Sequence, residues 1–84
     1  MDELKRSLRK VLVSRFGVKG ELDDDTGLFS GGLIDSLSVM DLVGFVEQEI
    51  GITIRPGDIN LENFDSIGRI LRFAARQISG KDGP

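Results

Sequence analysis

Apolar residues recur every three or four positions in three stretches of this 84-residue chain, and that spacing predicts three amphipathic α-helices. We expect helices over about residues 3–16, over Ser36–Ile50, and from a cap at Asn63 or Asp65 to Gly80. The expected apolar faces are Leu4, Leu8, Val11, Leu12 and Phe16; then Val39, Leu42, Val43, Val46 and Ile50; and last Phe64, Ile67, Ile70, Leu71, Ala74 and Ile78. Three such faces must be buried against one another, which predicts a helix bundle.

Two non-helical stretches connect these helices. Residues 17–35 hold five glycines and are long for a connection in a compact domain, so we expect a functional or mobile loop. The residues expected to pin this loop to the core are Leu22, Leu28, Phe29, Leu33 and Ile34. In the second stretch, Ile52–Ile54 is expected to be extended, and Pro56 suits the first turn of a short helix over about residues 56–61. The predicted fold is all-α: a small four-helix bundle of three longer helices plus one short helix, with a long loop between helices 1 and 2.

Length and composition restrict the chemistry of the chain. We expect a single domain over residues 1–80 and a flexible tail at 81–84. The chain has no Cys and no His, which excludes Ser-His and Cys-His catalysis and most transition-metal sites. The acidic run at residues 23–25 does not fit an EF-hand, because Gly27 stands where a third ligand is needed. No apolar run is long enough to span a membrane and no signal peptide is visible, so we expect a cytoplasmic protein.

The net charge of −3 conceals a strong segregation of charge along the chain. Residues 1–20 carry a net +4, residues 21–66 carry −10, and residues 67–84 carry +3. An acidic centre argues against nucleic-acid binding there and favours a basic protein partner, although a solvated acidic face explains the charge equally well.

The stretch from Gly31 to Ser38 combines flexibility with a helix start. Two glycines precede Asp35 and Ser36, and the apolar-periodic segment begins directly behind them. With Asp35 as the cap, Ser36 occupies the first helical position and directs its hydroxyl outward, beside the positive end of the helix dipole, where a phosphate is favoured. In isolation, an Asp-Ser pair is better explained by two capping residues.

The helix behind Ser36 is expected to expose a docking face. Leu37 and Met40 fall opposite the apolar stripe, among Asp41 and Glu47. Two apolar side chains directly below a displayed hydroxyl form a plausible surface for a partner protein.

These residues resemble the acyl carrier protein family, the phosphopantetheine-binding carrier proteins, over nearly the whole chain. The segments that carry the resemblance are Asp35-Ser36-Leu37, Leu42-Val43 with Glu47, Gly51-Ile52, Asp58-Ile59 and Asn63-Phe64-Asp65-Ser66-Ile67. A match to Asp-Ser-Leu alone means little, but the match at these spacings in a short, acidic chain without His or Cys is specific.

The resemblance implies a carrier and not an enzyme. Ser36 would receive 4′-phosphopantetheine from coenzyme A through a separate phosphopantetheinyl transferase that uses Mg²⁺. The thiol of the arm would hold acyl or aminoacyl groups as thioesters for a loading ligase or acyltransferase and for downstream biosynthetic enzymes. The protein is expected to act as a monomer, with no resident metal and no nucleic-acid partner.

Departures from the pattern concern the pathway. Carriers of housekeeping fatty-acid synthesis usually have an acid two positions after the modified Ser, where this chain has Ser38, and a denser acidic run where it has Gly44 and Gln48. Arg55 adds a positive charge. We therefore expect a stand-alone carrier of a dedicated polyketide, peptide or aminoacyl pathway, with housekeeping fatty-acid synthesis as the alternative. A remote alternative is a small interaction module in which Ser36 is free or phosphorylated.

Overall fold

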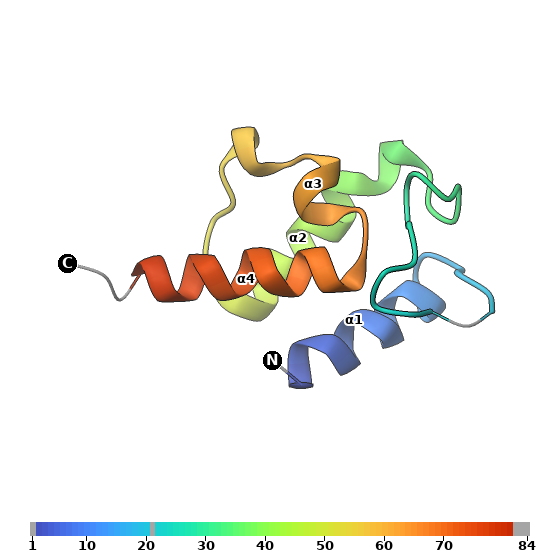
Figure 1. Cartoon of the computed structure of the whole chain (residues 1–84), viewed down its shortest axis with the longest axis horizontal. Coiled ribbons are helices and arrows are strands. Elements are labelled where there is room, and N and C mark those ends of the chain that lie inside the picture. The colour runs from blue at the N-terminus through green and yellow to red at the C-terminus, as the bar shows by residue number, and fades with distance from the viewer. Residues whose placement is uncertain (1, 21, 82–84) are drawn as a thin grey trace.

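The computed structural model describes residues 2–20 and 22–81, and within them the chain is helical with no strand. The α-helices are α1 (Asp2–Ser14), α2 (Val39–Ile50), α3 (Leu61–Phe64) and α4 (Ile67–Lys81). Two 3₁₀ helices, η1 (Ser36–Ser38) and η2 (Pro56–Asp58), precede α2 and α3. Figure 1 shows α4 crossing the molecule, with the short α3 above it and α1 below it. The predicted all-α bundle, with three longer helices, one short helix and a long loop after the first, is confirmed.

The helix α4 is the centre of the packing, because α1, α2 and α3 all contact it. The fully or almost fully buried residues come from all four helices and from the long loop: Leu8, Leu12, Leu28, Leu42, Val43, Val46, Phe64, Ile67, Ile70, Phe73 and Ala74. The rings of Phe64 and Phe73 lie 5.4 Å apart between centroids, in a tilted arrangement that favours aromatic contact. Phe73 was absent from the predicted stripe, whereas Ile78, which was included in it, is 39% exposed.

The start of α4 differs from the prediction that Asn63 or Asp65 caps it. The hydroxyl of Ser66 accepts a hydrogen bond from the N–H of Arg69 at 3.1 Å, so Ser66 caps this helix. Asn63 is buried inside α3, where its amide donates to the carbonyl of Asp58 and accepts from Arg76. The helix continues one residue beyond the expected end at Gly80, and the rest of the predicted tail, residues 82–84, lies outside the described residues.

The short third helix is also displaced from its predicted position at residues 56–61. Pro56 begins only the 3₁₀ helix η2, and a new helix begins after Asn60, whose side chain accepts from the N–H of Asn63 at 3.0 Å. An Asn before Leu61 is a strong cap, so the chain interrupts its helix there and begins α3. Residues 52–55, which lead to η2, belong to no helix, and Ile54 anchors them with 4% exposure while Ile52 is half-buried.

The loop after α1 packs onto the bundle as predicted, with one exception. Leu22, Leu28 and Ile34 are buried and Phe29 is half-buried, but Leu33 is 36% exposed. The acidic run within this loop is only partly solvated. Asp24 forms ion pairs with Lys5 at 2.9 Å and with Arg9 at 3.4 Å. The hydrogen bond from Lys5, together with the charges of both cations, holds the pKa of Asp24 below its ordinary value.

Residues 2–20 and 22–81 contain neither a membrane-spanning helix nor a metal-binding cluster of side chains. None of the helices is both long and apolar enough to cross a membrane. No group of three or more carboxylate side chains is arranged there to hold a metal ion.

Candidate functional site

Ser36 is exposed at the first position of η1, between the long loop and α2. Asp35 is extended, with φ −65° and ψ 135°, and its Oδ1 accepts the N–H of Leu37 at 2.9 Å. The predicted cap at Asp35 is therefore confirmed. The hydrogen bond between the Asp35 side chain and Leu37 fixes the turn that carries the hydroxyl of Ser36.

The predicted helix Ser36–Ile50 begins with a tighter turn than expected. Residues Ser36–Ser38 form a 3₁₀ helix, in which Ser38 N–H donates to the carbonyl of Asp35 at 2.8 Å. The α-helix then begins at Val39, and Ser38 supplies no side-chain cap. The N–H groups of Leu37 and Ser38 are bound by Asp35, and that of Val39 by the carbonyl of Ser36. An anionic group on Ser36 would therefore be favoured by the dipole of the helix that begins there, and not by free N–H groups.

An apolar hollow of about 190 Å³ opens directly beside Ser36. Its walls come from the loop, η1, α2 and the segment around α3: Phe29, Ser36, Val39, Ile59, Asn60, Leu61 and Phe64. In the sequence, Ile59 was noted as part of the family resemblance, and Leu61, which is 55% exposed, was not singled out. Leu61 could not be found from periodicity, because the start of α3 was placed elsewhere.

A second, more polar hollow of about 300 Å³ lies on the side of Asp35 that faces α1. It is lined by Arg15, Phe16, Leu33, Ile34, Asp35, Ser38 and Asp41. Arg15 follows the end of α1 and was not a candidate from sequence. Only the folded course of the loop brings this cation to the same hollow as Asp35 and Asp41.

The predicted docking residues divide into two groups. Leu37 is 87% exposed and Met40 is 59% exposed, and Asp41 is exposed beside them. Glu47 lies further along α2 and is half-buried, and its Oε2 accepts the N–H of Ile54 at 2.7 Å. Glu47 therefore ties α2 to the segment that follows it, a structural contact that the sequence did not indicate.

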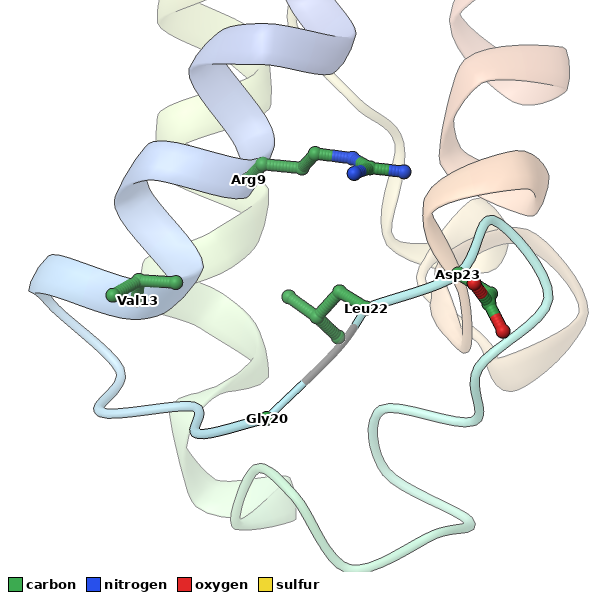
Figure 2. A pocket seen from close by; sticks show the side chains of 5 residues that line it. All are labelled: Arg9, Val13, Gly20, Leu22 and Asp23. Atoms are coloured by element: carbon green, nitrogen blue, oxygen red, sulfur yellow. The ribbon is translucent and has the colours of Figure 1, made fainter.

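The hollow in Figure 2, of about 450 Å³, is separate from this site. Arg9 and Val13 of α1 line one side of it, and Gly20, Leu22 and Asp23 line the other. It shares no lining residue with the two hollows that flank Ser36, and the guanidinium of Arg9 is already paired with Asp24.

Comparison with known proteins agrees with this arrangement. The family described as the phosphopantetheine attachment site matches residues 6–74. A probable acyl carrier protein, PigG, of Serratia sp. (strain ATCC 39006) is 33% identical over 60 residues, which cover 71% of this chain and 69% of that protein. No solved structure matches significantly. The chain belongs to the phosphopantetheine-binding acyl carrier protein family.

Membership of this family defines the class of activity. The group that such proteins bear is 4′-phosphopantetheine. Acyl carrier proteins are carriers and not catalysts, and they interact with a phosphopantetheinyl transferase and with biosynthetic enzymes. The features at Ser36 fit such a group: the exposed hydroxyl is a suitable point of attachment, and the apolar hollow lies directly beside it.

Proposed function

We propose that Ser36 is the residue that receives 4′-phosphopantetheine, and that the chain acts as a monomeric, single-domain carrier with no catalysis of its own. The observation that carries this proposal is the exposure of Ser36 at the capped start of η1, next to an apolar hollow. The positive end of the helix dipole at the start of α2 favours the phosphodiester that would form there.

The attachment step is a phosphoryl-type transfer at the hydroxyl of Ser36. Its Oγ forms a bond to the phosphorus that bears the pantetheine arm, and the pyrophosphate P–O bond of coenzyme A breaks. The departing 3′,5′-adenosine bisphosphate takes the electron pair, and the hydroxyl proton passes to a base of the transferase or to water. The terminal thiol of the arm then forms thioesters, a chemistry for which the chain has no sulfur nucleophile because it lacks Cys.

Leu37, Met40 and Asp41 are proposed as the docking surface for the transferase and for the loading enzyme. The two apolar side chains supply contact area, and Asp41 steers a basic partner towards Ser36. Glu47 can contribute charge to this surface, but its hydrogen bond to Ile54 means that its substitution also affects the fold.

We further infer a dedicated polyketide, peptide or aminoacyl pathway and not housekeeping fatty-acid synthesis. Three features reduce the acidic character of the surface around Ser36, along α2 and in the segment that follows it. Ser38 and Gln48 stand where acids are usual, Arg15 shares a hollow with Asp35 and Asp41, and Arg55 lies 3.4 Å from the carboxylate of Asp58. An enzyme that reads a dense acidic patch loses roughly 0.2–1 kcal/mol for each missing pair.

Incubation with coenzyme A, Mg²⁺ and a broad-specificity phosphopantetheinyl transferase tests the attachment site. The intact mass should increase by one arm, and Ser36→Ala should show no increase while its helical circular dichroism is unchanged. Modification of the Ala variant would place the arm elsewhere. A parent protein that is never modified would contradict the carrier proposal, and a phosphate alone on Ser36 in protein from its native host would indicate a switch.

Competition tests the pathway. The holo-protein, which bears the arm with a free thiol, is offered at equal concentration to a general malonyl transacylase and to a dedicated adenylating ligase or acyltransferase, and the thioesters are followed by mass. We expect little malonyl loading. Efficient malonyl loading with elongation to long chains would identify a fatty-acid carrier instead.

A further inference from the structure

Asp65, between α3 and α4, holds the loop that leads to Ser36. Its main-chain carbonyl accepts the N–H of Leu28 at 2.6 Å. Its Oδ1 accepts the N–H groups of Phe29 and Ser30, both at 2.9 Å, and its Oδ2 accepts the hydroxyl of Ser30 at 2.6 Å. One residue thus receives four hydrogen bonds from three consecutive residues of a loop that is distant in sequence.

The loop transmits this constraint towards Ser36 through its own backbone. The carbonyl of Leu28 accepts the N–H groups of both Leu33 and Ile34 at 2.9 Å. Leu28 is fully buried and Ile34 is 5% exposed, so both ends of this closed turn are fixed in the core. Asp35 follows as the cap, and Ser36 is therefore only two residues beyond the last amide that the turn holds.

Two glycines show how closely this turn is packed. A Cβ on Gly27 would overlap the hydroxyl of Ser30 and would lie 3.7 Å from Oδ2 of Asp65. A Cβ on Gly31 would overlap the carbonyl oxygen of Gly27. The turn therefore has little room to rearrange while Asp65 is bound to it.

The carboxylate of Asp65 is ionised at neutral pH. Partial burial opposes ionisation, but the hydrogen bonds from Ser30 and Phe29 and the charge of Arg69 outweigh it and hold the pKa of Asp65 below its ordinary value. Both carboxylate oxygens are then acceptors, as the three donors of the loop require.

We propose that Asp65 is a positioning residue for the modification of Ser36: by binding residues 28–30 it holds the turn that presents the hydroxyl to the transferase. This inference rests on the proposed attachment at Ser36. Within the described residues, the side chain of Asp65 forms hydrogen bonds only with Phe29 and Ser30, so it acts through the loop. Its effect is exerted on the fraction of molecules in which Ser36 is correctly placed.

The test compares kcat/KM for phosphopantetheinylation of the full chain by one transferase. Asp65→Ala removes all three acceptors of the side chain, and we expect a loss of about ten- to a hundredfold, as displacement of a reacting group by about 1 Å can cause. Asp65→Asn removes the same charge but retains an oxygen for the N–H groups of Phe29 and Ser30, and we expect it to lie much closer to the parent. Ser30→Ala removes only the hydroxyl donor and should be intermediate.

Glu62→Ala is the matched control, because it also deletes a carboxylate, from the neighbouring helix α3. The side chain of Glu62 is exposed and makes no hydrogen bond within the described residues. This variant should load like the parent. Hydrogen exchange at the amides of Phe29 and Ser30 is the second readout, and it should accelerate in Asp65→Ala and not in Glu62→Ala. If Asp65→Ala does not fold, Ser30→Ala provides the same comparison.

Two results would overturn the inference. Parent-like loading of Asp65→Ala would show that the turn does not limit access to Ser36. Equal losses in Asp65→Ala, Asp65→Asn and Glu62→Ala that disappear in high salt would show an effect of charge alone. Either result is distinct from failure of the proposed function, in which the parent protein itself is not modified at Ser36.

Discussion

Leu37 lies beside Ser36 on the proposed docking surface, and truncating it should separate docking from folding. Complete burial of a Leu side chain stabilises a fold by about 1.5–3 kcal/mol. Leu37 is 87% exposed, so only about an eighth of that contribution is present. Leu37→Ala should therefore lower the free energy of unfolding by about 0.2–0.4 kcal/mol.

Leu42 gives the matched comparison in the same helix, since its side chain is fully buried. Leu42→Ala removes the same atoms from the core and leaves a cavity, and it should cost about 2–5 kcal/mol. Urea unfolding followed by circular dichroism measures both variants, and the midpoint should shift clearly only for Leu42→Ala.

The opposite order is expected for docking. Second-order loading by the transferase should fall about fivefold or more for Leu37→Ala, as for an apolar residue at the centre of an interface. A loss of several kcal/mol of stability in Leu37→Ala would mean that the side chain is buried and that the helix is rotated from its described orientation. Unchanged loading would remove Leu37 from the docking surface.

Two further predictions concern the backbone and the acid response. Gly44→Ala should stabilise the protein by about 0.5–1 kcal/mol, because Gly44 lies within α2 and an added Cβ would meet no neighbouring group within 4 Å. Gly51→Ala should instead cost about 1–2 kcal/mol, because Gly51 ends α2 with φ +71°. Thermal unfolding measures both variants, and equal shifts of the midpoint would contradict these backbone conformations. The stabilisation from ionised Asp65 should be complete above about pH 5 and should be lost as the pH falls through the lowered pKa of Asp65. Urea unfolding between about pH 5 and pH 2 should therefore show a weaker loss of stability for Asp65→Ala than for the parent protein. The same dependence of stability on pH in both proteins would show that the loop hydrogen bonds do not depend on ionisation.

The sequence predicted well those features that depend on local periodicity and on local caps. The apolar spacing located the three longer helices, and the Asp35 side chain, two residues from its donor, was found as the cap. Exposure of Leu37 and Met40 followed from the rotation of the same helix. Each of these features is determined by residues that lie within one or two helical turns of one another in the sequence.

Features that depend on distant partners were missed. Asp65 was considered as a cap for the last helix. Its carboxylate instead accepts hydrogen bonds from Phe29 and Ser30, which precede it by 36 and 35 positions in the chain. Arg15 reaches the hollow beside Asp35 only because the intervening loop returns to the end of α1. Ser66 caps α4 in place of Asn63 or Asp65, and Asn60 caps the separate helix α3, because several good capping residues lie within a few positions and propensity alone does not decide among them.

The bond between Phe29 and Asp65 joins residues 36 positions apart, and this separation orders events during folding. Helices form from neighbours in microseconds or less, whereas a long-range closure must first overcome the entropy of the intervening chain. During synthesis, Ser36 leaves the ribosome well before Asp65, so loop residues 28–30 lack their partner until α3 and Asp65 have emerged. If Asp65 positions Ser36 as proposed, the chain would become a good substrate for its transferase only after the Asp65 contact has closed, and attachment of the arm would select molecules that have reached this late step of folding.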